Sequence, residues 1–351
     1  MTRGAQGPRV SLLMPNRNNA PVLDLVLDRL AVNTGYHDVE LVVVDDGSTD
    51  GSREILRRWR DSERFAEFRL IEREHSGVVE TLNAGLGAAT GELVVQLDAD
   101  ASIETPGWLD RMVSFFVSDE RIGVVTAKVV FEWGEIHACG VNVVGPEGLH
   151  DRGTRVTESV GRRTYHQRVL RFREDECPAC DRIAEVDGGI GCCMMYARGV
   201  ALEVGGYDPG FAPVWFDDLD LTMSIRRHGL KVFFLPDVRV VHHLGKRSVD
   251  ERVSARRRAA LALRSRAGAA LPPRARGRLA RALNLDRPSP ERWRRLVGHY
   301  DYWRRKWGFD VLNPDMQAVE ERWGATEICW RTNPEMRQAG ERIVARFDAS
   351  S

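Results

Sequence analysis

Two aspartates stand one residue apart, at Asp98 and Asp100, where the apolar run Leu93–Leu97 ends. The run is rich in β-branched residues and predicts a buried strand. Side chains two residues apart on an extended strand point the same way, so both carboxylates can bind one hard cation or one metal-bound diphosphate. Aspartate also ends strands as a turn former, and for the triplet taken alone that alternative stays open.

The elements that must position this pair alternate between strand and helix. Expected strands cover residues 9–14, 40–45, 68–72 and 92–97, and expected helices cover 20–32, 52–59 and 78–88. This alternation is typical of an α/β protein with a Rossmann-like sheet covered by helices. Because ligands of such sheets bind beyond the carboxyl ends of the strands, we expect the loops 14–18, 45–49 and 98–101 to meet in one crevice.

The following 150 residues are less regular. We expect a helix after residue 103, a strand from Gly123, a strand over 191–196, helices from 198 and over 217–228, and strands over 231–235 and 238–242. Between them, residues 136–182 are glycine-rich and charged. This composition indicates a variable loop region over the site.

The composition changes near residue 250. We expect a catalytic domain over 1–249, with a nucleotide-binding half (9–101) and an acceptor half (102–249), and an Arg-rich helical extension over 250–351. Residues 251–310 hold 16 Arg and one Lys against five acidic residues, about +12 in a chain of zero formal charge. Within 291–307 the aromatic side chains share one helical face, which favours packing on the body over a helix lying on anionic lipid.

The chain has 351 residues, of which 43% are apolar and 29% charged, as in an ordinary globular protein. No apolar run approaches the roughly 18–20 residues that span a bilayer, and the N-terminus lacks the apolar segment of a signal peptide. We therefore expect a cytoplasmic protein, with peripheral contact at the inner membrane face through 251–310. Cys177 and Cys180 have the spacing of half a zinc site, and ordinary buried thiols are the favoured alternative.

Several segments, in this order, resemble the inverting nucleotide-sugar glycosyltransferases of family 2, which have the GT-A fold. They are Ser11–Asn19 with Leu41–Asp50, Asn83–Gly85 with Gly91–Asp100, and Gly205–Phe211 followed by Trp215–Leu221 and Val240–His243. Together they span about residues 9 to 245, and their joint order is far more specific than any one of them. The resemblance implies a GT-A Rossmann-like mixed sheet flanked by helices, with a helical C-terminal extension.

The resemblance also implies the donor and metal sites. The donor nucleotide-sugar would contact Pro15, Asn16, Arg17, Asp45, Asp46, Asn83, Asp98, Ala99, Asp100 and Trp215. Asp46 would contact the base, which is chemically reasonable because a carboxylate accepts the imide N–H of uracil or thymine; capping of the next helix is its alternative. Mn²⁺ or Mg²⁺ would bind Asp98, Asp100 and His242, although His243, on the opposite strand face, is an equal candidate.

The acidic pair Asp217-Asp218 stands where the family usually has Glu-Asp. The resemblance implies that Asp218 is the catalytic base, which takes the proton of the acceptor hydroxyl, and that Asp217 holds the acceptor or tunes its neighbour. With Asp220, these acids also fit the first turn of a helix, where its dipole favours them. That alternative does not explain the preceding Trp215-Phe216, which suits a wall for a sugar ring.

The sequence thus predicts an inverting, metal-dependent glycosyltransferase of the hexosyltransferase type that uses a UDP- or dTDP-sugar. Its acceptor would be a glycan, a lipid-linked intermediate or a small molecule, as in cell-wall or polysaccharide biosynthesis. No nucleic-acid partner is expected, and the basic arm could instead form a homodimer contact. The alternatives are a catalytically silent nucleotide-sugar-binding protein and a nucleotidyltransferase, whose glycine-rich loop after the first strand has no counterpart in Met14–Asn19.

Overall fold

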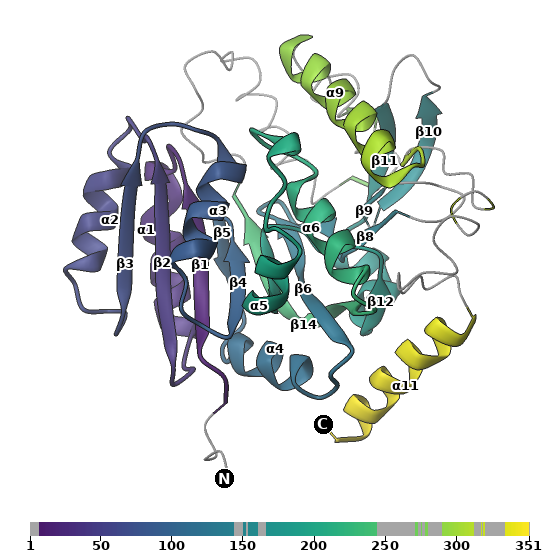
Figure 1. Ribbon diagram of the computed structural model, residues 1–351, viewed down its shortest axis with the longest axis horizontal. Coiled ribbons are helices and arrows are strands. Elements are labelled where there is room, and N and C mark those ends of the chain that lie inside the picture. Colours follow the sequence, from purple (N-terminus) through teal and green to yellow (C-terminus); the bar gives the residue numbers. More distant parts are fainter. Residues whose placement is uncertain are drawn as a thin grey trace.

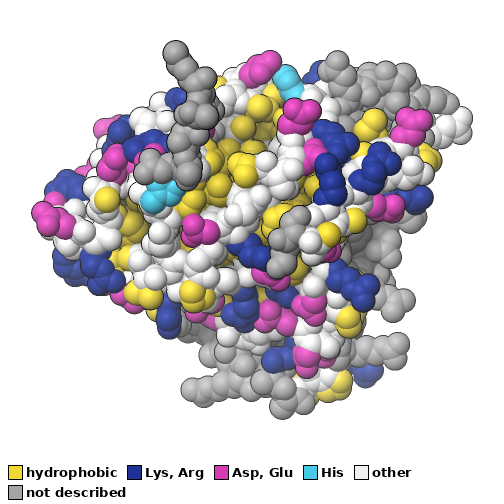
Figure 2. Space-filling view, turned by 90° about the horizontal axis from the view of Figure 1, so that it is seen from below, with side chains coloured by type: hydrophobic (Ala, Val, Ile, Leu, Met, Phe, Trp, Pro, Cys, Tyr) yellow, Lys and Arg dark blue, Asp and Glu magenta, His cyan; other side chains and the backbone are white. Residues whose placement is uncertain are grey.

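A computed structural model describes residues 7–143, 150–151, 154–160, 166–243, 271–272, 275, 278–279, 290–311, 317, 319 and 334–350. Most of the predicted basic arm therefore lies outside the described residues. None of the helices described is both long and apolar enough to cross a bilayer. On the face shown in Figure 2, Lys and Arg side chains are interspersed with Asp and Glu side chains, so neither charge sign dominates that face.

One mixed sheet of ten strands forms the centre of the protein (Figure 1). Its main path has the order β12 (Ala184–Val186), β14 (Lys231–His242), β6 (Ile122–Phe131), β13 (Cys193–Ala197), β4 (Leu93–Leu97), β1 (Val10–Asn16), β2 (Val39–Asp46) and β3 (Phe68–Arg73). Strands β3, β2, β1 and β4 are parallel, whereas β13 runs antiparallel to both β4 and β6. The fold confirms the predicted α/β mixed sheet and the strand–helix alternation of the first hundred residues.

Helices cover both faces of this sheet because each has one apolar face. One face packs against α1 (Ala20–Asn33), α2 (Ser52–Arg60) and α4 (Trp108–Phe116). The opposite face, toward the viewer in Figure 1, packs against α3 (Val78–Ala88), α5 (Arg198–Glu203) and α6 (Asp217–Arg226). Gly85 of α3 lies so close to β1 that an added Cβ would meet Leu13 at 2.0 Å, so the helix needs glycine there.

Two C-terminal helices pack on the body formed by residues 7–243. In α9 (Pro290–Trp307), Trp303 and Trp307 are fully buried in a cluster with Phe211 and Phe216. In α11 (Pro334–Ser350), Phe347 packs edge-on against Phe115 with 4.8 Å between ring centroids. Since truncating a buried aromatic costs about 3–5 kcal/mol, α9 is a structural part of the body, as the packing alternative predicted.

Three local expectations are corrected. The short strand β5 (Ala101–Ile103), which the sequence did not reveal, follows the aspartate pair and pairs with β14. Strand β14 is continuous over the two predicted segments, because the register shift between Leu235 and Arg239 lets it pass the proline without a break. The segment 136–182 is more regular than expected. It contains β7 (Ile136–Ala138), β8 (Val141–Asn142), β9 (His150–Asp151), the antiparallel pair β10 (Thr154–Val160) and β11 (His166–Arg171), and the 3-10 helices η1 (Glu174–Glu176) and η2 (Pro178–Asp181).

Candidate active site

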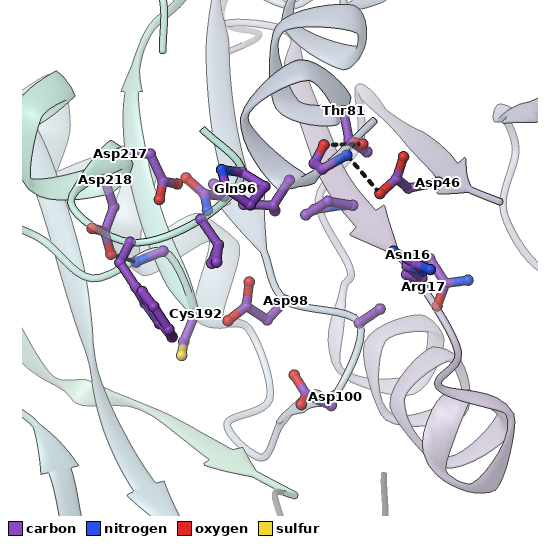
Figure 3. A pocket seen from close by; sticks show the side chains of 18 of the residues that line it. Asn16, Arg17, Asp46, Thr81, Gln96, Asp98, Asp100, Cys192, Asp217 and Asp218 are labelled. Carbon is purple, nitrogen blue, oxygen red and sulfur yellow. Dashed lines mark hydrogen bonds between the residues drawn. The ribbon is translucent and has the colours of Figure 1, made fainter. Parts of the chain in front are cut away.

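A cavity of about 660 Å³ opens beyond the carboxyl ends of β1, β2 and β4. Its lining includes residues 15–17, Asp46 and 98–100, so the three loops that were expected to converge do meet. Residues 213–218 line the other side, which brings segments from the first hundred residues and from the second half of the sheet region to one space. In Figure 3 the Asp98 and Asp100 side chains lie between Asp217 and Asp218 on one side and Asp46 on the other.

Asp46, at the end of β2, holds the loop 75–77, which closes one side of this cavity. Its carboxylate accepts hydrogen bonds from the backbone N–H of Ser76 at 2.7 Å and of Gly77 at 3.1 Å, and it contacts His75 Nδ1 at 2.7 Å. Burial works to raise the pKa of Asp46, but these bonds outweigh it and hold the pKa below its ordinary value. Asp46 does not cap α2, whose N-cap is Gly51.

Two predicted donor residues do not reach the cavity, and these expectations are corrected. Asp45 is fully buried and contacts Asn16, Ser48 and Arg53, so it braces the first two strand ends instead of facing a ligand. The side-chain amide of Asn83, on α3, is hydrogen-bonded to the backbone of Tyr207. Its Nδ2 donates to the Tyr207 carbonyl oxygen at 2.7 Å, and its Oδ1 accepts from the Tyr207 N–H at 2.9 Å. Both residues fix the loops around the site.

Asp98 and Asp100 occupy a tight turn between β4 and β5, in which the Ala101 N–H donates to the Asp98 carbonyl oxygen at 3.0 Å. Strand β5 pairs Ala101 with His242 of β14. This register places His242 Nε2 3.2 Å from Asp100 Oδ1, with both side chains buried. The pairing across two short strand ends therefore decides which histidine approaches the acidic pair.

His243, one residue later, points to the other face of β14. Its Nε2 lies 2.8 Å from Ser102 Oγ, and its Nδ1 lies 3.4 Å from Glu132. His242, which lines the cavity, is thus the histidine that faces the acidic pair. Ligand atoms of Asp98, Asp100 and His242 all lie within 4.8 Å of one another, and two carboxylates with one imidazole suit Mn²⁺ or Mg²⁺.

The side of the cavity opposite Asp46 is formed by a strained turn that leads into α6. Trp215 and Phe216 both have left-handed backbone, with φ of 78° and 70°, which costs of order 1–3 kcal/mol for each residue. This backbone turns the chain so that α6 begins at Asp217 directly at the cavity. The Pro213 carbonyl accepts from the Val78 N–H at 2.8 Å, which ties this turn to the start of α3.

Asp217 and Asp218 stand side by side but have different surroundings. Asp218 Oδ2 accepts from the Gly191 N–H at 2.8 Å, and Oδ1 accepts from the Leu219 N–H at 2.7 Å. Asp217 is buried, and burial first, then the charge of Asp218, raise its pKa well above the ordinary value. The two neighbouring carboxyl groups thus differ in their surroundings, since Asp217 is buried whereas Asp218 is held by two backbone N–H groups.

The third acid of this group, Asp220, belongs to the joint between α6 and α9. It accepts from Lys306 Nζ at 2.7 Å and from Trp307 Nε1 at 2.8 Å, and Lys306 also contacts Asp208 at 2.6 Å. Burial raises the pKa of Asp220, and the Lys306 charge opposes that rise. The acidic first turn of α6 thus contains both a cavity residue and a packing residue.

Several cavity residues were missed by sequence reasoning. Gln96 on β4 accepts from the Tyr207 hydroxyl at 2.7 Å, and Arg295 of α9 places its guanidinium 5.9 Å from the centre of the Trp215 ring. His137 and Cys192 line the cavity beside His242. No sequence signal marked these residues: Gln96 and His137 are isolated polar residues in apolar runs, and Arg295 is one of many arginines in its helix.

The surroundings of the Cys192 thiol and of the His137 imidazole, both next to His242, favour the uncharged form of each group. Burial, reinforced by the charges of Asp98 and Asp100, raises the pKa of the Cys192 thiol well above its ordinary value. Burial, with the neighbouring His242 and Arg171, lowers the pKa of His137 well below its ordinary value. In the described part of the chain, neither group of three ligating side chains includes Cys177 or Cys180, whose sulfurs lie 2.9 Å apart.

Comparison with known proteins gives the same architecture. A mannosyltransferase from Pyrobaculum calidifontis, solved with GDP-Man and Mn²⁺, superposes with a TM-score of 0.50 at 21% identity, over 97% of this chain and 85% of that one. GalNAc-T7, solved with UDP, GalNAc and Mn²⁺, gives 0.52 at 16% identity, over 86% and 58%. These likenesses show the fold, which is GT-A.

Sequence relatives cover the chain only in part. An uncharacterised protein of Sinorhizobium fredii is 26% identical over 67% of this chain and 24% of its own length. An O-antigen biosynthesis protein of Myxococcus xanthus is 26% identical over 67% and 17%, and a PGL/p-HBAD biosynthesis glycosyltransferase of Mycobacterium bovis is 34% identical over 36% and 51%. The chain spans about half or less of the length of these relatives. The sequence profile of glycosyl transferase family 2 matches residues 11–202, more than half of the chain, which therefore belongs to that family.

Proposed function

We propose that the protein transfers a hexose, with inversion, from a nucleoside diphosphate sugar to a hydroxyl of an acceptor, in a cation-dependent reaction. The observation that carries the proposal is that Asp218 and the group Asp98, Asp100 and His242 open into one cavity. A sugar bound between them would have the leaving diphosphate on one side and the base on the other. That arrangement is what a single inverting displacement requires.

Asp98, Asp100 and His242 would hold Mn²⁺ or Mg²⁺. When bound, the cation neutralises charge that develops on the leaving diphosphate. A partly exposed and a buried carboxylate with an imidazole neighbour fit this role, because the two acids supply hard oxygen ligands and His242 already lies 3.2 Å from Asp100. Ala99 lies between the two acids in the turn and lines the same wall.

Asp218 would take the proton of the acceptor hydroxyl. Its oxygens accept from the backbone N–H groups of Gly191 and Leu219, which fix the carboxylate at the cavity wall. Asp217, whose pKa is raised, would stay protonated and so leave Asp218 as the charged member of the pair. This division of roles gives the base a fixed direction and a fixed charge.

The donor base and sugar would occupy the Asp46 side of the cavity. Pro15, Asn16 and Arg17 line that side, and Asp46 closes it with the loop 75–77. A UDP- or dTDP-sugar fits the expectation for Asp46, whose remaining acceptor capacity would meet an imide N–H. The acceptor would enter past Trp215 and Arg295, a flat ring under a positive charge, which suits a sugar ring of an anionic or lipid-linked glycan.

The biological setting we propose is cell-wall or polysaccharide biosynthesis in the cytoplasm, at the inner membrane face. The relatives from Myxococcus and Mycobacterium, named for O-antigen and PGL/p-HBAD biosynthesis, support this setting. The basic arm over 251–310 would supply the membrane contact through anionic headgroups. A homodimer through the same arm is the other proposed use of that segment.

Products of donor turnover test the reaction class. The purified protein is incubated with a panel of UDP-, dTDP- and GDP-sugars, with and without Mn²⁺, and released nucleotides are separated by chromatography. We expect cation-dependent release of the nucleoside diphosphate from one donor. Release of pyrophosphate would instead indicate nucleotidyl transfer, and binding without turnover for every donor and acceptor would indicate a silent binding protein.

The cation site is tested by calorimetric titration of the preferred nucleotide with and without Mn²⁺. Wild-type protein should bind the nucleotide more tightly with Mn²⁺, and Asp100→Ala should remove that difference. Asp237→Ala, an exposed acid on β14 outside the cavity, is the matched control and should keep it. Equal wild-type affinity in both conditions would contradict the metal assignment.

A further inference from the structure

Three nitrogen and sulfur donors converge beside the acidic pair, on the side of His242 that faces away from Asp100. His137 Nδ1 lies 3.2 Å from His242 Nδ1. Cys192 Sγ lies 4.0 Å from His137 Nδ1 and 3.8 Å from His242 Nδ1. The donors come from β7, from β14 and from the residue before β13, so the fold brings together three distant segments.

The distances between these nitrogen and sulfur atoms are similar to those between ligand atoms around one bound zinc ion. Zinc binds imidazole nitrogen at about 2.0–2.1 Å and thiolate sulfur at about 2.3 Å in a tetrahedral arrangement, which places two nitrogens about 3.4 Å apart and nitrogen and sulfur about 3.6 Å apart. The observed distances are within about half an ångström of these values. All three residues also line the cavity, which provides an entry path and an open fourth position.

The two imidazoles are packed in a cluster of nearly parallel rings. The Phe131, His137 and His242 rings all contact one another, with 4.6 Å between the centroids of Phe131 and His137, 5.1 Å between His137 and His242, and 6.0 Å between Phe131 and His242. Trp133 stacks on Phe131 at 4.6 Å and 15°. Ordering the histidines before a cation arrives lowers the entropic cost of binding.

We propose that His137, Cys192 and His242 form a second cation site, selective for a borderline-soft divalent ion such as Zn²⁺. One thiol and two imidazoles favour such an ion over Mg²⁺ or Mn²⁺, which prefer the oxygen ligands of the neighbouring acids. Binding replaces the thiol proton of Cys192 by the Zn–S bond and releases that proton to solvent. The thiolate sulfur is then a negatively charged ligand, whereas the two imidazole nitrogens are neutral ligands.

The two sites share His242, and this consequence rests on the proposed function. Its Nε2 faces Asp100, whereas its Nδ1 faces His137 and Cys192. A neutral imidazole offers only one nitrogen lone pair, so both nitrogens can coordinate only after the ring loses its last proton. Zn²⁺ in the second site therefore competes with Mn²⁺ at the acidic pair and inhibits transfer.

Co²⁺ is the spectroscopic probe for the site, because it replaces zinc and shows a thiolate-to-metal charge-transfer band in the near ultraviolet. Titration of the wild-type chain with Co²⁺, without nucleotide, should produce this band with one equivalent, and Zn²⁺ should abolish it. Cys192→Ser should remove the band. Cys193→Ser, which alters the neighbouring buried thiol outside the cluster, is the matched control and should keep it.

Absence of the band in wild-type protein, or its persistence in Cys192→Ser, would overturn the site. If Cys192→Ser does not fold, as judged by circular dichroism, His137→Gln serves instead and should weaken Zn²⁺ binding. Removing even an outer partner of a metal ligand costs about 10- to 100-fold in affinity, so loss of a direct ligand should cost at least that much. An unchanged Zn²⁺ affinity in His137→Gln would also overturn the proposal.

Competition is measured by electron paramagnetic resonance of Mn²⁺. Zn²⁺ should release bound Mn²⁺ from wild-type protein, and a several-fold higher Zn²⁺ concentration should be needed in Cys192→Ser. A cobalt band without Mn²⁺ release would keep the second site but refute its coupling to the acidic pair. Since the cobalt spectrum needs no sugar donor, failure of the glycosyltransferase proposal would leave that result standing.

Discussion

The two sides of the cavity use aspartate in opposite ways. On the donor side, Asp46 is surrounded by N–H donors, and its pKa lies below the ordinary value. On the acceptor side, Asp217 is buried beside another carboxylate, and its pKa lies well above the ordinary value. The difference shows that its surroundings decide what an aspartate does. At a strand end surrounded by N–H donors, the ionised carboxylate accepts hydrogen bonds and orders a loop. At the buried start of a helix, the carboxyl group retains its proton to higher pH.

The largest expected effect is on the acceptor side. Asp218→Asn keeps the shape and the acceptor oxygen of the side chain but removes the base, so transfer should fall by about 10²–10⁴-fold. Nucleotide affinity, measured by calorimetry, should stay within about twofold because the donor side is untouched. A variant that loses nucleotide binding along with transfer would show that Asp218 shapes the donor site instead.

The reciprocal change is Asp46→Asn on the donor side. The amide cannot accept from all the N–H groups of residues 75–77, and lost hydrogen bonds to a charged group cost about 1.5–3 kcal/mol. We expect nucleotide Kd to rise about 10- to 100-fold, with kcat at saturating donor much less affected. If kcat fell as far as in Asp218→Asn while Kd stayed constant, the division between the two sides would be wrong.

A smaller effect, on stability, is expected at the joint between α6 and α9. Lys306→Met keeps the apolar stem but removes the ammonium group that contacts Asp208 and Asp220. Leaving the carboxylate of Asp220 in a buried setting without this cation should lower the free energy of unfolding by about 1–3 kcal/mol. Urea unfolding measures the loss, and the double variant Lys306→Met/Asp220→Asn should recover most of it.

The outcome at this joint also bears on the comparison of the two sides. If Lys306→Met were as stable as the wild type, the ion pairs of Lys306 would not be what holds α9 against α6. If the double variant stayed as unstable as the single one, the loss would come from the contacts of the Lys306 ammonium group with the Phe211 and Trp307 rings, whose centres lie 5.9 Å and 5.8 Å from Nζ. Either result would separate the acid that packs from the acids that face the cavity.

The sequence predicted most of the architecture because the first four strands and their helices have clear periodicity. The loops 14–18, 45–49 and 98–101 were placed in one crevice by the rule that parallel strands present their carboxyl ends together, whereas Asp218 was assigned through the family resemblance alone. The structure brings all of them to one cavity. The choice between His242 and His243 could not be made, because it depends on pairing with the three-residue strand β5. Such a strand has too few residues to show a period.

The errors have one physical cause. A motif shows that a residue type is needed near the site but not whether its side chain faces the ligand or the protein. Asp45 and Asn83 stand in matching segments, yet their polar groups are engaged by neighbouring loops. Conversely, His137 and Arg295 face the cavity from a region without readable pattern and from the C-terminal extension. Only three-dimensional packing reveals these two kinds of residue.

The finest test of the comparison is the sign of the pH dependence of stability. Asp217 binds its proton more tightly in the folded than in the unfolded state, so the free energy of unfolding should fall as pH rises from about 4 toward the raised pKa of Asp217. Asp217→Asn removes this titration and should flatten that decline.

Asp46 has the opposite shift: its contribution is present above its ordinary pKa near 3.8 and is lost as pH falls below it. Asp46→Asn should therefore flatten the acid limb instead. Thermal unfolding from pH 3 to 8 compares the two variants with wild type, and equal effects of both on the same limb would refute the contrast between the two sides.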